Sequence, residues 1–186
     1  MNPSATSREE IMSVCREIAA HSGLNALSVR NVARECGVAP STLYNYYSDK
    51  DEITLATVES IWQDIFHTGD VCETDFTFPQ YVEYLFDCAK RGAQSYPSFL
   101  TAHSVALAGS RKGEAKNTME RYFSHMKTGM LEVLHADKNV SEKAFTPALT
   151  EDDLMAFVLD NILLLLMKGA QSCSALCELI CRIIYP

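Results

Sequence analysis

Glycine and proline are scarce in this sequence, and long apolar runs are missing. There are eight glycines and six prolines in 186 residues, which are too few for the many turns of a β-sandwich or barrel. No apolar run reaches the roughly 18 residues that a membrane helix needs. The N-terminal MNPSATSREEI also lacks the apolar stretch of a signal peptide. We therefore expect a cytoplasmic, helical protein that does not enter a membrane.

Catalytic and metal-binding motifs are missing as well. The seven cysteines include no CxxC pair, and an odd number cannot form a fully paired disulfide framework. HExxH, GxGxxG, GxSxG and Walker A motifs do not occur, and the five histidines are scattered without a motif partner. The sequence thus predicts free thiols, no enzymatic activity, no cofactor and no metal site.

What the chain does contain is an uneven distribution of charge. Its hydrophobic fraction of 47% suffices for a packed core, and its net charge is −8. Residues 1–50 carry five basic and five acidic side chains, whereas residues 51–186 carry 11 basic and 19 acidic ones. Because nucleic-acid-binding surfaces are usually basic, we expect any contact with DNA to come from the neutral N-terminal part.

Two helices are predicted at the start of the chain. Ser7 and Glu10 have the spacing of a capping box, and apolar residues then recur at helical spacing as far as Gly23. Ser28 can cap a second helix, which Gly37 is expected to end because glycine accepts a positive φ.

A third, short helix follows at Pro40, a residue that suits the first position of a helix. Only Leu43 and Tyr47 have the spacing of core residues in it, and Asp49 with Glu52 can cap the long helix that comes next. Two helices joined by a tight turn with one glycine, with a helix on either side, are the helix-turn-helix arrangement. This arrangement explains why the third helix is poor in core residues, since much of its surface is expected to contact DNA.

Residues 7–53, here called the head, resemble the DNA-binding part of the TetR family of transcriptional regulators. The segments LSVRNVARECGV and STLYNYYSDKDEI follow the family pattern GV-x-x-x-TLY-x-x-F-x-x-K-x-x-L almost position by position. Ala39 departs from it where a hydroxyl often caps the recognition helix, so a weaker cap is expected. Tyr47 replaces the commoner phenylalanine, and its hydroxyl needs a partner or water. The resemblance implies that the third helix lies in the major groove.

Eight residues of the head are predicted to contact DNA. Asparagine can bond bidentately to adenine, tyrosine hydroxyls commonly bond phosphate oxygens, and a lysine at a helix start favours a phosphate. The alternatives are a Tyr44 that mainly packs the head together, serine and threonine hydroxyls that only start helices, and cations that are simply solvated. The predicted residues are Ser28, Arg30, Ser41, Thr42, Tyr44, Asn45, Tyr46 and Lys50.

Beyond residue 53 the sequence predicts only helices, about nine in the whole all-α chain. We divide it into a DNA-binding domain at 1–50 and a ligand-binding and dimerisation domain at 51–186. The segment LMAFVLDNILLLLM is apolar nearly all round, so it must be buried on several sides. Asp160 and Asn161 inside it argue against a membrane span. The resemblance implies a four-helix bundle with a second copy, and hence a homodimer through residues 151–184.

Three cysteines, Cys173, Cys177 and Cys181, repeat every four residues along the last helix. They could form a metal or redox site, or pack as small hydrophobic side chains. Packing is the better interpretation because neither a histidine nor a second cysteine cluster lies near them in the sequence. A disulfide across a dimer is a further, minor alternative.

A ligand pocket among the middle helices is implied by the resemblance alone. Aromatic residues and methionines at helical spacing equally suit a plain core, and a histidine flanked by apolar residues suits a buried site. The pocket candidates are Trp62, Phe66, Tyr84, Phe99, His103, Phe123 and Met126.

The function hypothesis is a ligand-responsive regulator of transcription. It would repress by binding a palindromic operator in double-stranded DNA as a homodimer, and a small-molecule effector would release it. Two alternatives are a ligand-independent activator and an all-helical protein-binding module with a vestigial head. Neither the effector nor the operator can be read from the residues.

Overall fold

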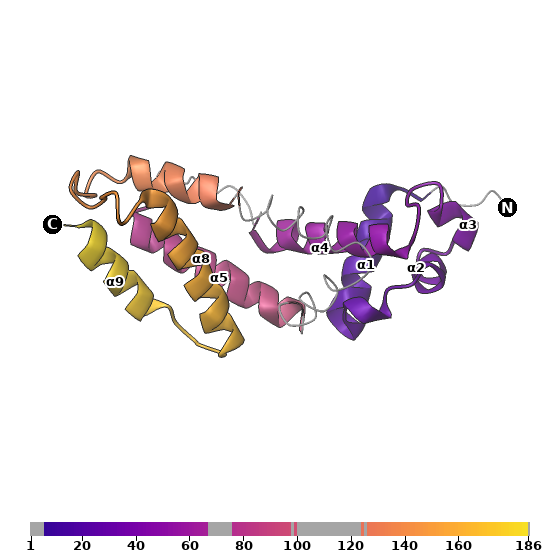
Figure 1. The fold of residues 1–186 in the computed structure, drawn as a ribbon. Helices are drawn as coiled ribbons and strands as arrows, with labels where there is room; N and C mark the ends of the chain where they lie inside the picture. Colours follow the sequence, from indigo (N-terminus) through magenta and orange to yellow (C-terminus); the bar gives the residue numbers. More distant parts are fainter. Residues whose placement is uncertain (1–5, 67–75, 98, 100–123, 125, 186) are drawn as a thin grey trace. The chain divides into compact units, whose positions relative to one another are not determined.

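The computed structural model describes residues 6–66, 76–97, 99, 124 and 126–185. These residues form helices and no β-strand, which confirms the all-α prediction (Figure 1). The helices are α1 (Arg8–Ser22), the 3-10 helix η1 (Leu24–Ala26), α2 (Val29–Glu35), α3 (Pro40–Leu43), α4 (Lys50–Phe66), α5 (Phe78–Ser95), α8 (Glu151–Met167) and α9 (Ser174–Ile184). Residues 126–136 are also helical. The expected number of about nine is close to this, and residues 100–123 lie outside the described part.

The chain forms two compact units. The described residues of the first lie within 1–65 and 92–119, and those of the second within 66–91 and 120–186. The first unit therefore holds the whole head together with most of α4. The functional boundary after residue 50 stays a prediction.

Side chains cap the first two helices of the head as the sequence predicts. The Ser7 hydroxyl accepts from the Glu10 backbone N–H at 3.1 Å, and the Glu10 carboxylate accepts from the Ser7 N–H at 2.9 Å. Ser28 accepts from the Asn31 N–H at 3.1 Å at the start of α2. Gly37 follows α2 with φ 67°, the left-handed conformation that glycine adopts without strain. These local interactions fix where the helices begin and end.

The third helix is shorter than an ideal recognition helix. Ala39 supplies no side-chain hydrogen bond to its start, as expected, and the α-helix ends at Leu43. The chain then continues in turns, because the Asn45 N–H donates to the Thr42 carbonyl at 3.2 Å and the Tyr46 N–H to the Leu43 carbonyl at 2.9 Å. Leu43 is fully buried, so α3 is anchored through its core side while its remaining surface faces outward.

A buried apolar core holds α1, α2, α3 and α4 together. Burial of such side chains is the main favourable term in folding, at about 25 cal/mol per Å² of apolar surface. The buried residues of the head are Ile11, Cys15, Ile18, Ala19, Leu24, Leu27, Val32, Ala33, Leu43, Tyr47 and Ile53. Leu24 enters this core from η1, a 3-10 turn that the sequence pattern did not predict.

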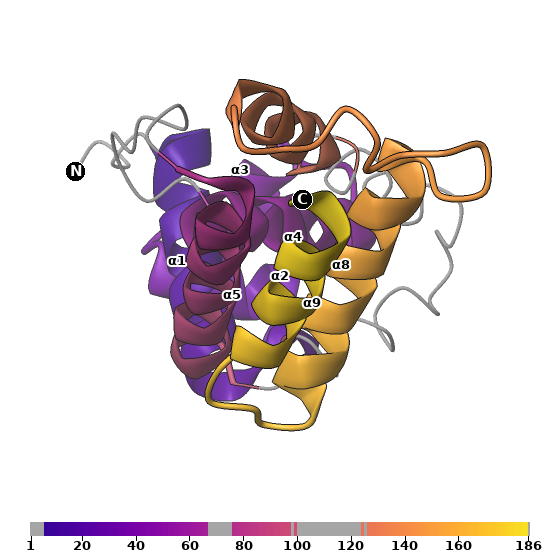
Figure 2. The same cartoon turned by 90° about the vertical axis from the view of Figure 1, so that its left-hand side faces the viewer.

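The second unit has its own core, made by α5, residues 126–136, α8 and α9. In Figure 2, α9 lies between α5 and α8. The buried residues of this core include Phe78, Phe86, Met130, Leu154 and Ile180. Among the described helices, none is both long enough and apolar enough to cross a membrane.

Buried Asp137 connects three segments of this second unit. One carboxylate oxygen accepts from the Phe78 N–H at 2.9 Å, at the start of α5, and from the Tyr185 hydroxyl at 2.6 Å. The other accepts from the backbone and side-chain amides of Asn139, both at 3.0 Å. Burial acts to raise the pKa of Asp137, but these hydrogen bonds outweigh it and lower the pKa below its usual value. The carboxylate is therefore held in its charged form.

Candidate nucleic-acid interface

The eight predicted DNA-binding residues lie on α2, α3, the turn after α3 and the first residue of α4. Five of them are exposed and three are half-buried. The exposed ones are Arg30, Ser41, Tyr44, Asn45 and Lys50, and the half-buried ones are Ser28, Thr42 and Tyr46. All eight lie in the first unit, on or next to the two helices of the helix-turn-helix, and their contact with DNA stays a prediction.

Tyr44 is the most informative of these residues. Its side chain is 56% exposed, although tyrosine is usually better buried than this. Neighbouring Asn45 is exposed as well. An exposed phenol beside an exposed amide offers two hydrogen-bonding groups to a duplex, one suited to phosphate and one to a base edge. The contact of Tyr44 with DNA stays a prediction, as does the alternative that it packs the head together with its hydroxyl at the surface.

Arg30 and Lys50 supply positive charge at this surface. Arg30 lies in the first turn of α2 and Lys50 is the first residue of α4. Neither side chain makes a hydrogen bond or an ion pair with any residue in the described part of the chain. Both cations are therefore available to a phosphate without breaking an existing interaction. Lys50 additionally adjoins the N–H groups at the start of α4, an arrangement that favours anions.

Tyr46 already uses its hydroxyl inside the head. The hydroxyl donates to the Thr6 carbonyl, and the Tyr46 carbonyl accepts from Arg8 Nη2 at 2.7 Å. These two bonds hold the turn after α3 against the segment that leads into α1. A phenol has one proton to donate, so Tyr46 can donate to a phosphate only if the bond to Thr6 opens. Its DNA contact stays a prediction with this condition attached.

Tyr47 lies in a different environment from its neighbours. It is 4% exposed, and the Arg8 guanidinium carbon lies 5.0 Å from the centre of its ring. Burial raises the pKa of the Tyr47 phenol, and the charge of Arg8 opposes that shift. The residue therefore belongs to the core, as its spacing predicts, and the Arg8 guanidinium lies over its ring.

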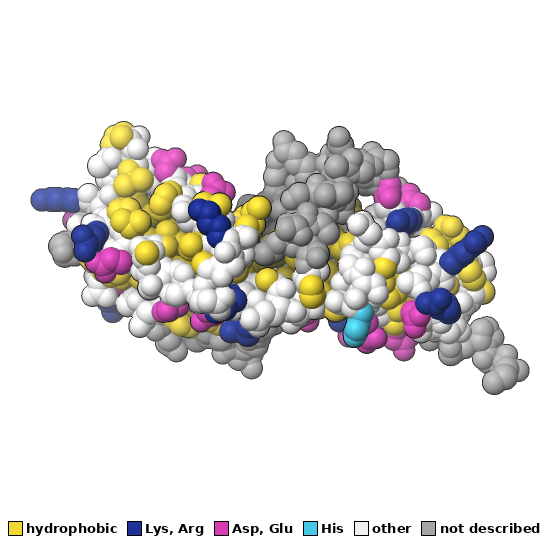
Figure 3. Space-filling model, turned by 90° about the horizontal axis from the view of Figure 1, so that it is seen from below, with side chains coloured by type: hydrophobic (Ala, Val, Ile, Leu, Met, Phe, Trp, Pro, Cys, Tyr) yellow, Lys and Arg dark blue, Asp and Glu magenta, His cyan; other side chains and the backbone are white. Residues whose placement is uncertain are grey.

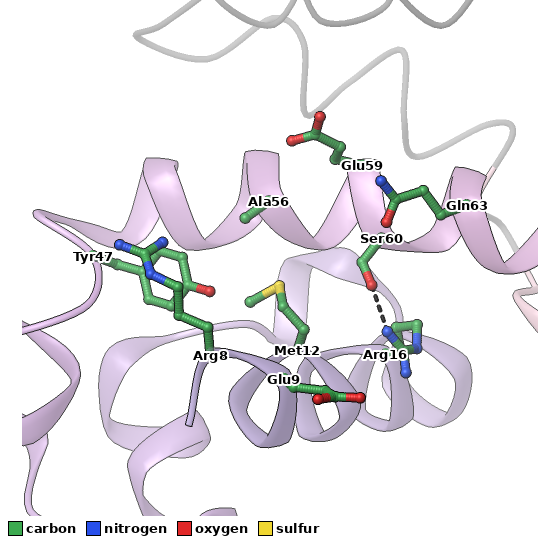
Figure 4. A pocket seen from close by; sticks show the side chains of 9 residues that line it. All are labelled: Arg8, Glu9, Met12, Arg16, Tyr47, Ala56, Glu59, Ser60 and Gln63. Carbon is green, nitrogen blue, oxygen red and sulfur yellow. Dashed lines mark hydrogen bonds between the residues drawn. The ribbon is translucent and has the colours of Figure 1, made fainter. Parts of the chain in front are cut away.

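A groove of about 560 Å³ lies between α1 and α4 (Figure 4). Arg16 Nη1 donates to the Ser60 hydroxyl across its floor. The groove is lined by Arg8, Glu9, Met12, Arg16, Tyr47, Ala56, Glu59, Ser60 and Gln63. This groove could not be predicted from the sequence, because its lining comes from α1, from α4 and from Tyr47 in the segment before α4, and shares no motif. Its charges are mixed, and it does not include any of the eight predicted DNA-binding residues.

The seven pocket candidates fall into three sets. Trp62 and Phe99 lie in the first unit and pack edge to face, with ring centres 5.3 Å apart. Phe66, Tyr84 and Met126 are half-buried and pack against the core of the second unit. His103 and Phe123 lie outside the described residues. The ligand pocket therefore stays a prediction.

The surface of α8 and α9 carries an apolar face among the described residues. Of the five large hydrophobic side chains exposed among the described residues, four lie there: Phe157 (43%), Leu164 (47%), Met167 (68%) and Leu179 (52%). Figure 3 shows hydrophobic side chains gathered over this part of the second unit. Exposed apolar patches of this kind mark interaction surfaces.

The three cysteines at the start of α9 and within it are less exposed than the side chains of that apolar face. Cys173 is buried, and Cys177 and Cys181 are half-buried. The Cys177 thiol lies 3.6 Å from the Pro79 carbonyl at the start of α5. Within the described residues, no group of three histidine, cysteine, aspartate or glutamate side chains is placed to hold a metal ion.

Comparison with known proteins identifies the head. Residues 11–57 match the family model "Bacterial regulatory proteins, tetR family". An uncharacterized HTH-type transcriptional regulator of Haemophilus influenzae is 37% identical over 54 residues. That alignment covers 29% of this chain and 26% of the relative, so the chain matches only about a quarter of that protein.

Solved structures extend the similarity to the rest of the fold. A TetR-family transcriptional regulator from Haemophilus influenzae superposes with a TM-score of 0.58 at 21% identity, over 96% of each chain. The regulator FadR from Bacillus subtilis, solved in complex with stearoyl-CoA, gives a TM-score of 0.56 at 13% identity, over 88% of this chain and 89% of that one. At such identities the superpositions show a shared fold.

Proposed function

We propose that this chain, which belongs to the TetR family of bacterial regulatory proteins, represses transcription by binding a palindromic operator as a homodimer. The observation that carries the proposal is the surface around α3. An anchored helix-turn-helix there presents exposed Tyr44 and Asn45 beside two cations without a described partner, Arg30 and Lys50. This combination of phosphate-binding and base-reading groups is what recognition of duplex DNA requires.

Selection of binding sites from a random duplex library tests the proposal directly. Purified protein at moderate salt, without added ligand, should enrich a palindrome. Its half-sites should be centred one helical turn apart, about 34–36 Å, or a multiple of this distance. Failure to enrich any sequence at low salt, by protein whose fold has been checked, would contradict DNA recognition by this head.

Substitutions at the interface distinguish a DNA-binding head from a vestigial one. Tyr44→Ala and Lys50→Gln should each weaken operator binding, because each removes one group from the duplex contact. Asn25→Ala serves as the matched control, since Asn25 is also exposed in the head but belongs to η1. Equal affinity of all three variants in an anisotropy titration would favour the vestigial alternative.

The dependence of binding on salt provides a second test. If Arg30 and Lys50 each neutralise one phosphate, a dimer makes about four such contacts, and log K should fall with log salt with a slope of about −3.6. Lys50→Gln removes two contacts per dimer and should reduce the slope to about −1.8. An unchanged slope would show that Lys50 does not bind a phosphate.

The homodimer is proposed on the apolar face of α8 and α9, within the predicted residues 151–184. Phe157→Glu and Leu179→Glu place a charge in this face and should convert the dimer to a monomer. Ala148→Glu adds the same charge at an exposed position in the loop before α8, and should leave the mass unchanged. Light scattering at several concentrations measures the outcome, and a dimeric mass for both face variants would exclude this interface.

We further propose that a small molecule releases the protein from its operator through thermodynamic linkage between the two binding events. An effector that binds one arrangement of the dimer more tightly shifts the protein toward it, typically with about 1–3 kcal/mol of coupling. Stearoyl-CoA is a first probe because it occupies the structurally similar FadR of Bacillus subtilis. Release of operator by stearoyl-CoA but not by coenzyme A would assign an acyl-chain effector. A ligand-independent activator would bind the operator equally well with either compound.

A further inference from the structure

Two thiols approach each other at the start of α9. Cys173 Sγ and Cys177 Sγ lie 3.7 Å apart, whereas a disulfide bond is about 2.05 Å long. Closing the bond therefore needs a movement of roughly 1.7 Å. Residues four apart on a helix are separated by a rise of about 6 Å, which lies within the Cα separations that disulfides span, about 4.4–6.8 Å.

The backbone at Cys173 allows this movement more easily than a helix interior would. Cys173 is the residue just before α9, and its φ of −106° and ψ of 16° are not helical. Its carbonyl accepts from the Cys177 N–H at 3.0 Å, and the Ser174 N–H is held by the Ser172 hydroxyl at 3.0 Å. Only this first turn has to adjust, because the rest of α9 is anchored by buried Ile180 and Ile184.

We propose that Cys173 and Cys177 form a redox-sensitive dithiol, a modification site that closes to a disulfide within one chain when it meets a peroxide. The site is independent of the DNA-binding function proposed above.

The two sulfurs have different roles in this reaction. Cys177 is half-buried, so a small oxidant can reach it. Cys173 is 2% exposed and reacts with the oxidised Cys177 rather than with the oxidant. The Cys177 thiolate takes one oxygen from the peroxide as the O–O bond breaks, giving a sulfenic acid and, from hydrogen peroxide, hydroxide. The proton released when the thiol ionised converts the hydroxide to water. The Cys173 sulfur then displaces the sulfenic hydroxyl, forms the S–S bond and releases a second water. Two electrons pass from the sulfurs to the peroxide, and a thiol reductant reverses the change.

The surroundings of the two thiols slow their oxidation at neutral pH and favour a disulfide within one chain. Burial raises the pKa of Cys173 to about 12, and burial also raises the pKa of Cys177, where the hydrogen bond from Cys173 opposes the shift. Little thiolate is therefore present at neutral pH, and the rate of oxidation should rise about tenfold per pH unit above neutrality. A buried Cys173 cannot reach another protein molecule, which favours an internal bond.

Peptide mapping tests the site in the intact protein. The folded chain is treated with hydrogen peroxide, quenched in acid, denatured, alkylated and digested without reduction. The parent should lose two alkylatable thiols, with a disulfide in the peptide that contains both cysteines. In Cys177→Ser, Cys173 should stay alkylatable and no disulfide should form at this site. Cys181→Ser is the matched control, and it should still form the bond between Cys173 and Cys177.

Hydrogen exchange of the same samples reports the structural consequence. Amides in the first turn of α9 should exchange faster in the oxidised parent and return to their original rates after reduction. Cys173→Ser, which keeps nearly the same side-chain volume, should show no peroxide effect. The proposal is overturned if both thiols remain alkylatable, if Cys177 pairs with Cys181 instead, or if the disulfide joins two chains.

Discussion

Replacing Asp137 by asparagine should strongly destabilise the second unit, although it exchanges only one carboxylate oxygen for an NH₂ group. The carboxylate accepts four hydrogen bonds, from the Phe78 N–H, the Tyr185 hydroxyl and the two Asn139 amides. An asparagine offers one acceptor oxygen and presents an NH₂ group to the remaining donors. If the amide oxygen stays with Asn139, the buried Phe78 N–H and the half-buried Tyr185 hydroxyl lose their acceptor, and each such loss costs about 1–3 kcal/mol.

The expected loss for Asp137→Asn is thus roughly 2–6 kcal/mol, with the lower end reached if the loop relaxes. For a chain of this length, 1 kcal/mol shifts the melting temperature by about 2–4 °C, so a decrease of about 4–24 °C is expected. Urea and thermal unfolding followed by circular dichroism measure both quantities, at one fixed protein concentration because a dimer would add to the apparent stability. A loss below about 0.5 kcal/mol would refute the assigned role of the carboxylate.

Tyr185→Phe is the matched control for this network. It removes one of the four donors and leaves the carboxylate in place, so it should cost only about 1 kcal/mol. The double variant should lose less than the sum of the two, since both changes act on the same hydrogen bond between Asp137 and Tyr185.

The acid dependence of stability follows from the lowered pKa of Asp137. A carboxyl group with a folded-state pKa below its unfolded value, about 3.9, contributes its full stability above that value. The contribution is lost as the pH falls through the folded-state pKa. The parent should therefore lose more stability than Asp137→Asn between neutral pH and strongly acidic pH, and parallel curves would contradict the depressed pKa.

Two further predictions concern the first unit. Gly92→Ala should destabilise the parent by about 1–2 kcal/mol, because its Cβ would lie 2.4 Å from Ile65 Cγ1. In an Ile65→Ala background the same change should instead stabilise by up to about 1 kcal/mol through helix propensity, and urea titrations of the four proteins measure this reversal of sign. Tyr46→Phe should cost about 0.5–1.5 kcal/mol by removing the hydroxyl bond to the Thr6 carbonyl. Unchanged thermal stability of this variant would show that the bond is not maintained in solution.

Local chemistry explains which parts of the fold could be predicted from the sequence. Ser7, Ser28 and Gly37 each act on backbone groups within four residues, so their spacing alone locates the helix ends. The same holds for buried Leu43, whose spacing marks it as the anchor of α3.

Interactions between distant segments explain most of what could not be predicted. The bond from Tyr46 to the Thr6 carbonyl and the capping of α5 by Asp137 join residues 40 and 59 positions apart. No short sequence motif identifies the partners in either bond, because both contacts depend on how the helices pack. The α1–α4 groove has the same origin, whereas η1 was missed because three residues are too few to show a period.

The charges of the head show why pairing of two chains matters for binding DNA. Three of its five cations are engaged internally: Arg8 with the Tyr46 carbonyl, Arg16 with the Ser60 hydroxyl, and Arg34 with Glu35. This leaves Arg30 and Lys50 for phosphates, which is a weak electrostatic contribution for one head. Joining two heads makes the second contact intramolecular and can strengthen binding by about 10²–10⁴. Loss of the α8 and α9 interface should therefore weaken operator binding more than the loss of either cation.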